Sequence, residues 1–403
     1  MLRLVKVESF MEIAFVSSVT LGEDEVLRAS GIGVYVQALT RELAKRNIPV
    51  IQVTGSGKSG GGDSAPAAEK NTPEKNVKIY RISDKPVRSN SRFIFKLAFK
   101  MRSLKFGSDT IIHAQRPELL LPFIWFKHRN PRICTLHGSS YKSVALKHSG
   151  LYTAMYRRLE SYCLKRAAGI IAVDNATRKE YIERYPNLIN KITVIPIGID
   201  LKKFKIMDKR SLRAHYDLPA DAKVVLYAGR LEREKRLDAL LRAYADLSKK
   251  YGRASSKLHL LIVGEGRLRA ELEALASDLK LKNVHFTGAI PHDEIPEVMN
   301  CADVFVLCSA FEGSPTVVKE ALACGVPVVA TEVGSIPEVV EPGKSGELLP
   351  QKAPPEKISM KIYKILSAEK EQAFNAEACA EKVKKFGMKV ITDKIVGIYH
   401  EVQ

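Results

Sequence analysis

The sequence predicts an α/β protein made of two doubly wound, Rossmann-like domains. The chain has 403 residues, which is more than a single hydrophobic core usually serves. Along most of its length, short apolar segments alternate with segments of helical periodicity, as a parallel sheet with crossover helices requires. Apolar residues make up 45% of the composition, which is enough to fill two such cores.

The expected strands form one group in each half of the chain, because each is a short apolar run bounded by loop residues. In the amino half they span residues 12–16, 50–53, 77–82, 110–113, 132–136, 169–173 and 192–195. In the carboxyl half they span residues 223–228, 258–263, 284–286, 304–307, 326–331 and 347–349. We place the boundary near Pro196–Asp200, which gives an N-terminal domain of residues 1–197 and a C-terminal domain of residues 198–387.

Two segments of the amino half show no periodic pattern. Residues 54–76 are rich in Gly, Ser, Pro and Lys, a composition that predicts a long mobile loop. Residues 1–10 precede the first strand and predict a ragged extension or an alternative start.

Residues 311–325, which read FEGSPTVVKEALACG, predict a short helix. Ser314 is a preferred N-cap residue, Pro315 suits the first helical position and Gly325 suits the stop, so we expect a helix of about ten residues. The segment follows the apolar run 304–307. It therefore lies at the carboxyl end of a buried strand, where open α/β sheets bind their ligands.

Two glutamates of this segment can contact one ligand. Glu312 lies just before the predicted helix and Glu320 lies well inside it. At about 1.5 Å of rise per residue, the two carboxylates reach different parts of a ligand that lies across the helix N-terminus, where free N–H groups favour anions. A sugar nucleotide has this shape. The alternative is a pair of solvated surface carboxylates.

A cluster of cations follows the first strand of the carboxyl half. Arg230 comes directly after this strand, and Lys235 with Arg236 opens a predicted helix. Cations at a helix N-terminus oppose the helix dipole unless an anion neutralises them, and a diphosphate would do so. The alternative is that Glu232 and Glu234 neutralise these cations locally.

These segments carry a resemblance to a known family. The donor half of the retaining family 4 glycosyltransferases, which have the GT-B fold, is similar to three ordered segments: Gly229–Tyr244, Leu260–Glu273 and Val284–Val340. The amino half is similar more loosely, through Ile13–Gly33, Thr135–Gly138 and Val194–Asp200. The resemblance implies two Rossmann-like domains that face each other across a cleft, with residues 388–403 crossing back to the N-terminal domain. It assigns the acceptor to residues 1–197 and the nucleotide sugar to residues 198–387.

The resemblance also implies roles for single residues. Glu320 would hold the ribose hydroxyls, Glu312 the hydroxyls of the donor sugar, and Arg230 with Lys235 the diphosphate. The implied catalytic set is His137, Arg230, Lys235 and Glu312, and the implied donor-binding set adds Gly31, Gly33, Gly264, Ile290, Gly313, Ser314, Pro315, Thr316 and Glu320. Pro315 stands where many members have a second glycine, and proline has no N–H to donate, so the sugar contacts there should differ.

Some of these residues also allow a structural interpretation. Gly31 and Gly33 open a predicted helix in a loop that a substrate could approach closely, but they do not form the GxGxxG dinucleotide motif. Gly264 belongs to a Gly-Glu-Gly turn that reads more readily as structural. His137 follows a buried strand, so a hydrogen-bonded structural role is the alternative to lining the pocket beside the donor sugar. His113, also at a strand end, reads as structural.

The motifs that are missing from the sequence narrow the chemistry. No DxD motif or metal-ligand cluster follows a strand, so we expect no metal and no cofactor, and the charge of the leaving group falls to Arg230, Lys235 and backbone N–H groups. No carboxylate pair flanks a site as a hydrolase requires. The six cysteines show neither zinc nor disulfide spacing and read as core thiols.

The resemblance implies the transfer of a hexosyl group, with retention, from a UDP- or GDP-linked sugar to an acceptor hydroxyl in glycolipid, polysaccharide or glycoconjugate synthesis. One alternative is a catalytically silent protein that binds sugar nucleotides. Another is a soluble enzyme that acts on a small sugar or sugar-phosphate acceptor. An epimerase or phosphorylase of the same fold should show a different acid/base set or a lysine-bound cofactor.

The charge distribution bears on the acceptor. Residues 1–200 hold 32 basic and 17 acidic side chains, whereas residues 201–403 hold 32 and 28, so the positive charge is concentrated in the amino half. A predicted helix there places Arg92, Lys96 and Lys100 at helical spacing beside aromatic residues, the pattern of an interfacial helix at an anionic membrane that presents a lipid-linked acceptor. A solvated helix packed on its own domain is the alternative. Nucleic acid is disfavoured, because no stacking motif or recognition module is visible.

Apolar runs bear on the location of the protein. No run approaches the length of a membrane span, and the first residues lack the apolar core of a signal peptide. We therefore expect a cytoplasmic protein that can bind peripherally to the cytoplasmic face of the membrane.

Overall fold

The computed structural model describes residues 11–18, 31–55, 76–83, 89–145, 150–216, 218–368 and 374–403. The chain divides into two compact units, Met1–Pro196 with Met388–Gln403 and Ile197–Gly387. The first boundary lies one residue before the expected one, and the second lies at the expected place. Almost all of the expected long loop at 54–76, and the whole of the expected extension at 1–10, lie outside the described residues.

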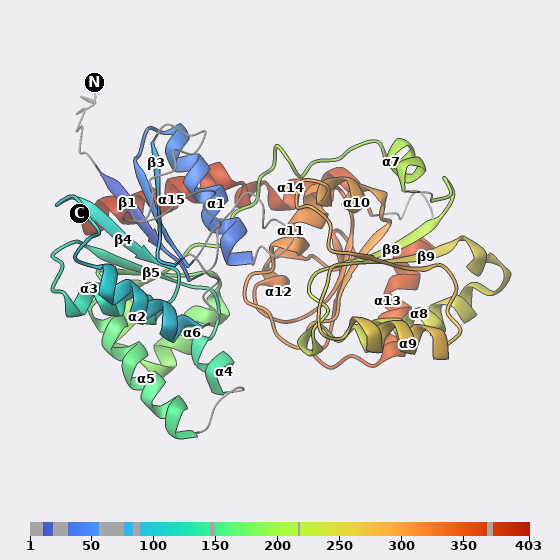
Figure 1. Cartoon of the computed structure of the whole chain (residues 1–403). Helices are drawn as coiled ribbons and strands as arrows, with labels where there is room; N and C mark the ends of the chain where they lie inside the picture. The colour runs from blue at the N-terminus through green and yellow to red at the C-terminus, as the bar shows by residue number, and fades with distance from the viewer. Residues whose placement is uncertain are drawn as a thin grey trace. The chain divides into compact units, whose positions relative to one another are not determined.

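The first unit contains a seven-stranded parallel sheet (Figure 1). Its strands lie in the order β3-β2-β1-β4-β5-β6-β7, so the chain builds outward from β1 to one edge and then from β4 to the other. Ile13 of β1 pairs with Val50 of β2 on one side and Ile111 of β4 on the other. The strands are β1 Glu12–Val16, β2 Val50–Thr54, β3 Val77–Arg81, β4 Thr110–Ala114, β5 Arg132–Leu136, β6 Gly169–Ala172 and β7 Ile192–Val194.

Helices cover both faces of this sheet, as a doubly wound fold requires (Figure 1). One face carries α1 (Gly31–Lys45) and the C-terminal helix α15 (Met388–Val402). The other carries α2 (Asn90–Lys100), α3 (Leu121–Trp125), α5 (Gly150–Lys165) and α6 (Asn175–Arg184), and α4 (Ser140–Ala145) packs on α5.

Helix α15 is anchored to the first unit, as expected for residues 388–403. His113 of β4 pairs through Nδ1 with Tyr399 Oη at 2.7 Å and through Nε2 with Thr135 Oγ1 at 2.7 Å. The Arg46 guanidinium also donates to Asp393 Oδ1 at 2.6 Å. His113 is fully buried, and burial lowers the pKa of His113 to about 3, so it serves as a neutral structural histidine.

The second unit contains a six-stranded parallel sheet in the order β10-β9-β8-β11-β12-β13. The strands are β8 Lys223–Ala228, β9 Leu258–Val263, β10 Val284–Gly288, β11 Val304–Leu307, β12 Val328–Thr331 and β13 Gly346–Leu349. The thirteen expected strands of the two units are all present, with ends within two residues of the expected ones. Short apolar runs bounded by loop residues thus carried enough information to locate them.

Helices again cover both faces of the sheet (Figure 1). Helices α8 (Leu237–Tyr251), α9 (Arg269–Asp278) and α13 (Pro355–Leu366) lie on one face, and α10 (Ile295–Cys301), α11 (Thr316–Ala323) and α14 (Ala376–Val383) lie on the other. The remaining helices are α7 (Lys209–His215) and α12 (Ile336–Val339).

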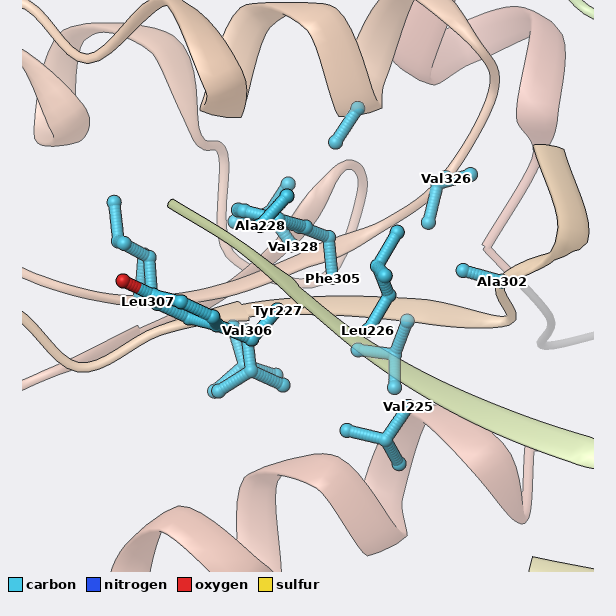
Figure 2. Packing of buried hydrophobic residues seen from close by; sticks show 14 of the residues in the cluster. Val225, Leu226, Tyr227, Ala228, Ala302, Phe305, Val306, Leu307, Val326 and Val328 are labelled. Carbon is cyan, nitrogen blue, oxygen red and sulfur yellow. The ribbon is translucent and has the colours of Figure 1, made fainter. Parts of the chain in front are cut away.

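The core of the second unit is continuous across its sheet. Side chains of β8 and β11 extend to both sides of the sheet toward the covering helices (Figure 2). Burial on both faces explains why these strands read as unbroken apolar runs. All six cysteines are buried and free, so the prediction of core thiols is confirmed.

Candidate active site

The predicted donor residues gather at the carboxyl edge of the second sheet. Strand β8 lies beside β11, with Val225 paired to Val304, so the loops that follow the two strands are neighbours. The backbone joins them directly, because the Ala310 N–H donates to the Glu234 carbonyl at 2.8 Å. Arg230 and Lys235 come from the first loop and Glu312 from the second. This edge is where parallel α/β sheets present ligand-binding loops.

Lys235 and Glu312 form an ion pair at this edge. The distance from Lys235 Nζ to Glu312 Oε1 is 2.5 Å, and the Ser309 hydroxyl donates to the same oxygen at 2.6 Å. The two side chains are only 15% and 13% exposed. Local neutralisation by Glu232 or Glu234 therefore does not hold for Lys235, whose partner lies 77 positions away.

Arg230 is placed differently from Lys235. Its guanidinium donates to Glu234 Oε1 at 3.1 Å, and its side chain is 70% exposed. Local neutralisation, the alternative considered for this cluster, therefore holds for Arg230. Glu232 binds the exposed Arg267 instead.

The predicted helix start after β8 was wrong. Lys235 ends a 3₁₀ turn (Arg233–Lys235), and Arg236 has a left-handed φ of 52°, so helix α8 begins only at Leu237. The Arg236 guanidinium donates to the carbonyls of Gln351 and Ala353, both at 3.1 Å, which holds this break in place. Lys235 therefore projects from a turn before the helix and not from its first turn.

The predicted cap of the donor helix was also wrong. Helix α11 begins at Thr316 with Pro315 at the N-cap position and runs for eight residues to Ala323, while Ser314 caps nothing. The buried Ser314 hydroxyl instead accepts a hydrogen bond from Lys319 Nζ at 2.9 Å. We call Gly313–Thr316 the donor loop. Its last residue, Thr316, begins α11, and Pro315 has no N–H to donate.

Glu320 lies inside the second unit near the donor loop and is 7% exposed. Burial raises the pKa of Glu320 to about 7, against the lowering effects of a hydrogen bond from Thr316 and of the cations Lys203 and Lys319. His292 Nε2 lies 4.0 Å from Glu320 Oε1. A carboxyl group in this setting can accept or donate hydrogen bonds near neutral pH.

Sequence reasoning missed the residues around Glu320. Lys203 Nζ donates to His292 Nδ1 at 2.5 Å and to Asp293 Oδ1 at 2.7 Å, so a cation and an imidazole stand behind the glutamate. His292 directly follows the Ile290–Pro291 segment of the resemblance, and this position was the available signal. Lys319 was overlooked because lysines in helices usually face solvent.

Gly264 and Ile290 frame the same edge from β9 and β10. Gly264 has a φ of 132°, and a Cβ atom there would lie 1.9 Å from the Gly229 carbonyl oxygen. The residue is therefore needed for the close approach of two loops, in line with its structural reading. Ile290 is half-buried and packs on the core of the unit.

The predicted residues of the first unit form a separate group. Gly31 and Gly33 open helix α1, and the residues immediately before them lie outside the described part of the chain. His137 Nε2 pairs with Gln115 Oε1 at 2.8 Å, and the Tyr35 ring lies edge-on at 5.4 Å. Burial, with a smaller contribution from Arg116, lowers the pKa of His137 to about 3, so the ring is neutral. His137 Nδ1 is buried and has no hydrogen-bond partner within the described ranges.

The predicted interfacial helix corresponds to α2. Phe93 is buried in the core, whereas Phe95 and Phe99 are 65% and 73% exposed and stack edge to face at 4.7 Å. Lys96 Nζ donates to Ser83 Oγ at 2.6 Å and Lys100 Nζ to the Arg81 carbonyl at 3.5 Å, which ties both to their own unit. Arg92 is exposed.

Among the described residues, no three His, Cys, Asp or Glu side chains lie close enough together to hold a metal ion. Within the same ranges, no helix is both long and apolar enough to cross a membrane.

Two family models match the chain. The model described as glycosyl transferases group 1 matches residues 208–385, and the model described as glycosyltransferase family 4 matches residues 29–203. Each model thus falls almost entirely within one structural unit, and the two together span most of the chain.

Curated relatives include D-inositol 3-phosphate glycosyltransferases. The protein of Catenulispora acidiphila is 30% identical over 246 residues, 60% of this chain and 57% of that protein. The protein of Segniliparus rotundus is 29% identical over 276 residues, 67% of this chain and 60% of that protein. The chain spans about three fifths of the length of these relatives.

Solved structures show the same fold. Sucrose-phosphate synthase of Thermosynechococcus elongatus superposes with a TM-score of 0.78 at 24% identity, covering 97% of this chain and 98% of that one. HepE of Anabaena in complex with UDP and glucose superposes with a TM-score of 0.73 at 19% identity, covering 97% and 99%. The architecture is that of GT-B glycosyltransferase structures.

Proposed function

The chain belongs to the GT-B glycosyltransferases of group 1 and family 4, and we propose that it moves a hexosyl group from a nucleotide-diphosphate sugar to an acceptor hydroxyl. The proposed transfer retains the anomeric configuration and needs no metal ion. The observation that carries this proposal is the Lys235–Glu312 ion pair at the carboxyl edge of the second sheet. It supplies a cation for a diphosphate and a carboxylate for sugar hydroxyls at one place.

The ion pair suggests how the donor binds. In the ligand-free protein each charge stabilises the other in a poorly solvated position. A bound diphosphate would take over Lys235, and Glu312, still held by Ser309, would then accept hydrogen bonds from sugar hydroxyls. Glu320, behind the donor loop, would hold the ribose hydroxyls in either protonation state.

The transfer step follows from these positions. The acceptor oxygen bonds to the anomeric carbon while the bond from that carbon to the diphosphate oxygen breaks, and the acceptor proton passes to the departing diphosphate. Lys235, Arg230 and the amide groups of the donor loop stabilise the charge that develops on the leaving group, which is the usual source of the largest rate effect. A metal ion is not required for this stabilisation.

A UDP-linked sugar is the first donor to test. HepE, which shares the fold, is described in complexes with UDP and glucose and with UDP-glucose. A GDP-linked sugar is the second, because the contacts that we propose involve the ribose, diphosphate and hexose and not the base.

The acceptor that we propose carries negative charge and is lipid-linked or a saccharide presented at an anionic membrane. The exposed aromatic and basic surface of α2 supports this choice. A soluble sugar-phosphate acceptor is the second candidate, because the two curated relatives described above are named for inositol 3-phosphate. An open pocket of about 650 Å³ in the first unit, lined in part by Arg157, Arg158 and Arg184, suits such an anion.

Calorimetry with two variants tests the donor site. UDP, UDP-glucose, GDP and GDP-mannose are titrated into wild type, Glu320→Ala and Glu312→Ala. Glu320→Ala should weaken binding of the nucleotide diphosphate and the nucleotide sugar alike, since both contain the ribose, whereas Glu312→Ala should weaken mainly the nucleotide sugar. Equal losses for both ligands in Glu312→Ala would show that its role is misassigned.

The reaction itself is tested by product analysis. The acceptors are inositol 3-phosphate and a bacterial lipid extract, and proton NMR reports the anomeric configuration of the product. An inverted product would refute retention. If the protein bound the donor tightly but neither transferred the sugar nor slowly hydrolysed the donor, the catalytically silent binder would be favoured over the enzyme.

A further inference from the structure

Lys319 is a fully buried lysine at the centre of the second unit. It precedes Glu320 on α11, and its side chain has no exposed surface. Its Nζ donates to the Ile197 carbonyl at 2.7 Å and to Ser314 Oγ at 2.9 Å, and it stands 4.9 Å from the centroid of the Phe386 ring. An ammonium group tolerates such burial only where polar partners replace water, and the aromatic face adds to that stabilisation.

The partners of Lys319 come from three distant parts of the chain. Ser314 belongs to the donor loop, whereas Ile197 and Phe386 lie at the two ends of the second unit, Ile197–Gly387. These ends are joined to each other: the Ile199 N–H donates to the Phe386 carbonyl at 3.0 Å, and Ile199 forms a parallel bridge with Gly387. We call Ile197–Ile199 with Phe386–Gly387 the paired ends. They are the segments through which the chain enters and leaves this unit.

The donor loop has a second support on its other side. The Ser335 N–H donates to the Gly313 carbonyl at 2.9 Å, and the hydroxyls of Ser335 and Ser314 are 3.2 Å apart. Two side chains thus hold Ser314. Ser335 reaches it from the loop after β12, and Lys319 is the one that also reaches the paired ends.

We propose that Lys319 is a positioning residue that couples the donor loop to the paired ends. The coupling rests on the proposed function in one respect, since it takes the donor loop to be where the nucleotide sugar binds. A ligand that orders Ser314 also orders Lys319 and, through the Ile197 carbonyl, the paired ends. Thermodynamic linkage requires the reverse effect as well: loosening the paired ends weakens donor binding.

Amide hydrogen exchange in the ligand-free protein tests the positioning directly. The Ser335 amide, bonded to Gly313, reports on the donor loop, and the Ile199 amide, bonded to Phe386, reports on the paired ends. Lys319→Met keeps most of the side-chain volume and removes the charge-assisted hydrogen bonds, so both amides should exchange about tenfold faster. Unchanged exchange at either amide in a folded Lys319→Met protein would overturn the proposal.

Lys361→Met is the matched control. Lys361, like Lys319, belongs to the second unit, and its partner is the buried carboxylate of Glu347. It lies on α13, on the opposite face of the sheet from α11. Its loss should lower the thermal midpoint without a selective effect on the Ser335 and Ile199 amides. If Lys361→Met sped up exchange at both amides as much as Lys319→Met does, the effect of Lys319 would be a loss of general stability and not a selective one.

Ser314→Ala keeps the test decisive if Lys319→Met does not fold. This variant removes the contact to the donor loop and leaves the hydrogen bond from Lys319 to Ile197 in place. The Ser335 amide should exchange faster, and the Ile199 amide should not. Faster exchange at neither amide would contradict the role given to the Lys319–Ser314 contact.

Added ligand then tests the coupling. In wild type, saturating UDP-glucose or GDP-mannose should slow exchange at both amides. In Ser314→Ala the same ligands should slow exchange at the Ser335 amide alone. The KM of Lys319→Met for the donor should rise at least about tenfold, with a smaller change in kcat. Protection of Ser335 without Ile199 in wild type would refute coupling. If no nucleotide sugar binds wild type, the proposed function fails, while the ligand-free measurements still decide the positioning role.

Discussion

At the scale of single residues, the ion pair of Lys235 and Glu312 matters most. Each side chain is largely withdrawn from water, and breaking such a pair from one side leaves an uncompensated charge. Lys235 therefore has a partner before the donor arrives and can exchange it for a diphosphate. Arg230 is exposed and pairs with the nearby Glu234, so it has no such constraint and can move toward the ligand at little cost.

The first prediction concerns these two cations. Lys235→Ala and Arg230→Ala should each lower kcat/KM by about 10² or more, because each removes a charge that stabilises the leaving group. The loss should be larger for Lys235, since Glu312 is then left unpaired. The control is Arg267→Ala, which removes an exposed arginine paired with Glu232 and should leave kcat/KM unchanged. A chelator should not affect the wild-type rate; loss of activity with EDTA and recovery with magnesium would refute the metal-free mechanism.

The second prediction concerns Glu320 and pH. Burial raises the pKa of Glu320 to about 7 from an ordinary value of 4.5. Between these pH values the folded protein holds a proton that the unfolded chain has released, so the free energy of unfolding should fall as pH rises from about 4.5 to about 7. Glu320→Gln removes this dependence: it should be more stable than wild type by on the order of 3 kcal/mol at pH 8 and similar to wild type at pH 4.

Urea unfolding at several pH values measures this difference. The control is Glu332→Gln, which changes an exposed glutamate of the same unit and should leave the pH dependence as in wild type. A stability difference between Glu320→Gln and wild type that is the same at pH 4 and pH 8 would show that Glu320 is not protonated near neutrality.

At the scale of elements, the loop after β12 shapes the donor loop. Gly334 has a φ of 56°, and a Cβ atom there would lie 2.0 Å from the Gly313 carbonyl oxygen. The backbones of the two loops therefore approach closely at this point, and the neighbouring Ser335 N–H donates to the Gly313 carbonyl. The sequence offers Gly334 only as a turn residue; its contact with Gly313 depends on β11 and β12 lying side by side.

The third prediction follows from this contact. Gly334→Ala should displace Gly313 and raise the KM for the nucleotide sugar at least about tenfold, while Gly343→Ala should not. Gly343 has a similarly positive φ of 80° but open space where its Cβ would lie, so this control carries the backbone strain without the collision. Equal KM values in the two variants would show that the strain and not the contact is responsible.

At the scale of the whole molecule, charge and exposed aromatic residues gather in the first unit. The stretch from Lys75 to Lys147 holds 16 basic side chains and few acidic ones. Helix α2 packs against α3, and the exposed aromatic residues of this region are Phe95, Phe99, Trp125 and Phe126. Basic groups near an anionic leaflet contribute on the order of 1 kcal/mol each, and aromatic rings favour the interfacial region.

The fourth prediction is that this surface binds anionic membranes. Wild type should float with vesicles that contain phosphatidylglycerol at low salt and not with neutral vesicles, because the attraction is electrostatic and screened. Changing Arg92, Lys96 and Lys100 to glutamate should abolish flotation, and Phe95→Ser with Phe99→Ser should weaken it. The control is Met360→Ser, which removes an exposed apolar side chain from the second unit. If wild type did not float with anionic vesicles at low salt, the soluble sugar-phosphate acceptor would be the better candidate.

The sequence alone was enough to predict the two parallel sheets, their strand positions, the loops that carry Arg230, Lys235 and Glu312, and the helix that carries Glu320. It could do so because apolar periodicity and loop residues are local signals that are read along the chain. It also located the end of α11 and the return of residues 388–403 to the first unit, the latter through the family resemblance.

Only the tertiary structure decided which of these residues meet. Lys235 pairs with Glu312 because β8 and β11 are adjacent, although they are far apart in sequence, and local charge patterning had suggested a nearer partner. The position of Ser314 in the sequence predicted a helix cap, but its hydroxyl instead accepts a hydrogen bond from the buried Lys319. Phe93 and Phe95 are two residues apart, yet one is buried and the other exposed, because the sheet lies on one side of α2. Such choices depend on contacts between distant segments, which no local pattern contains.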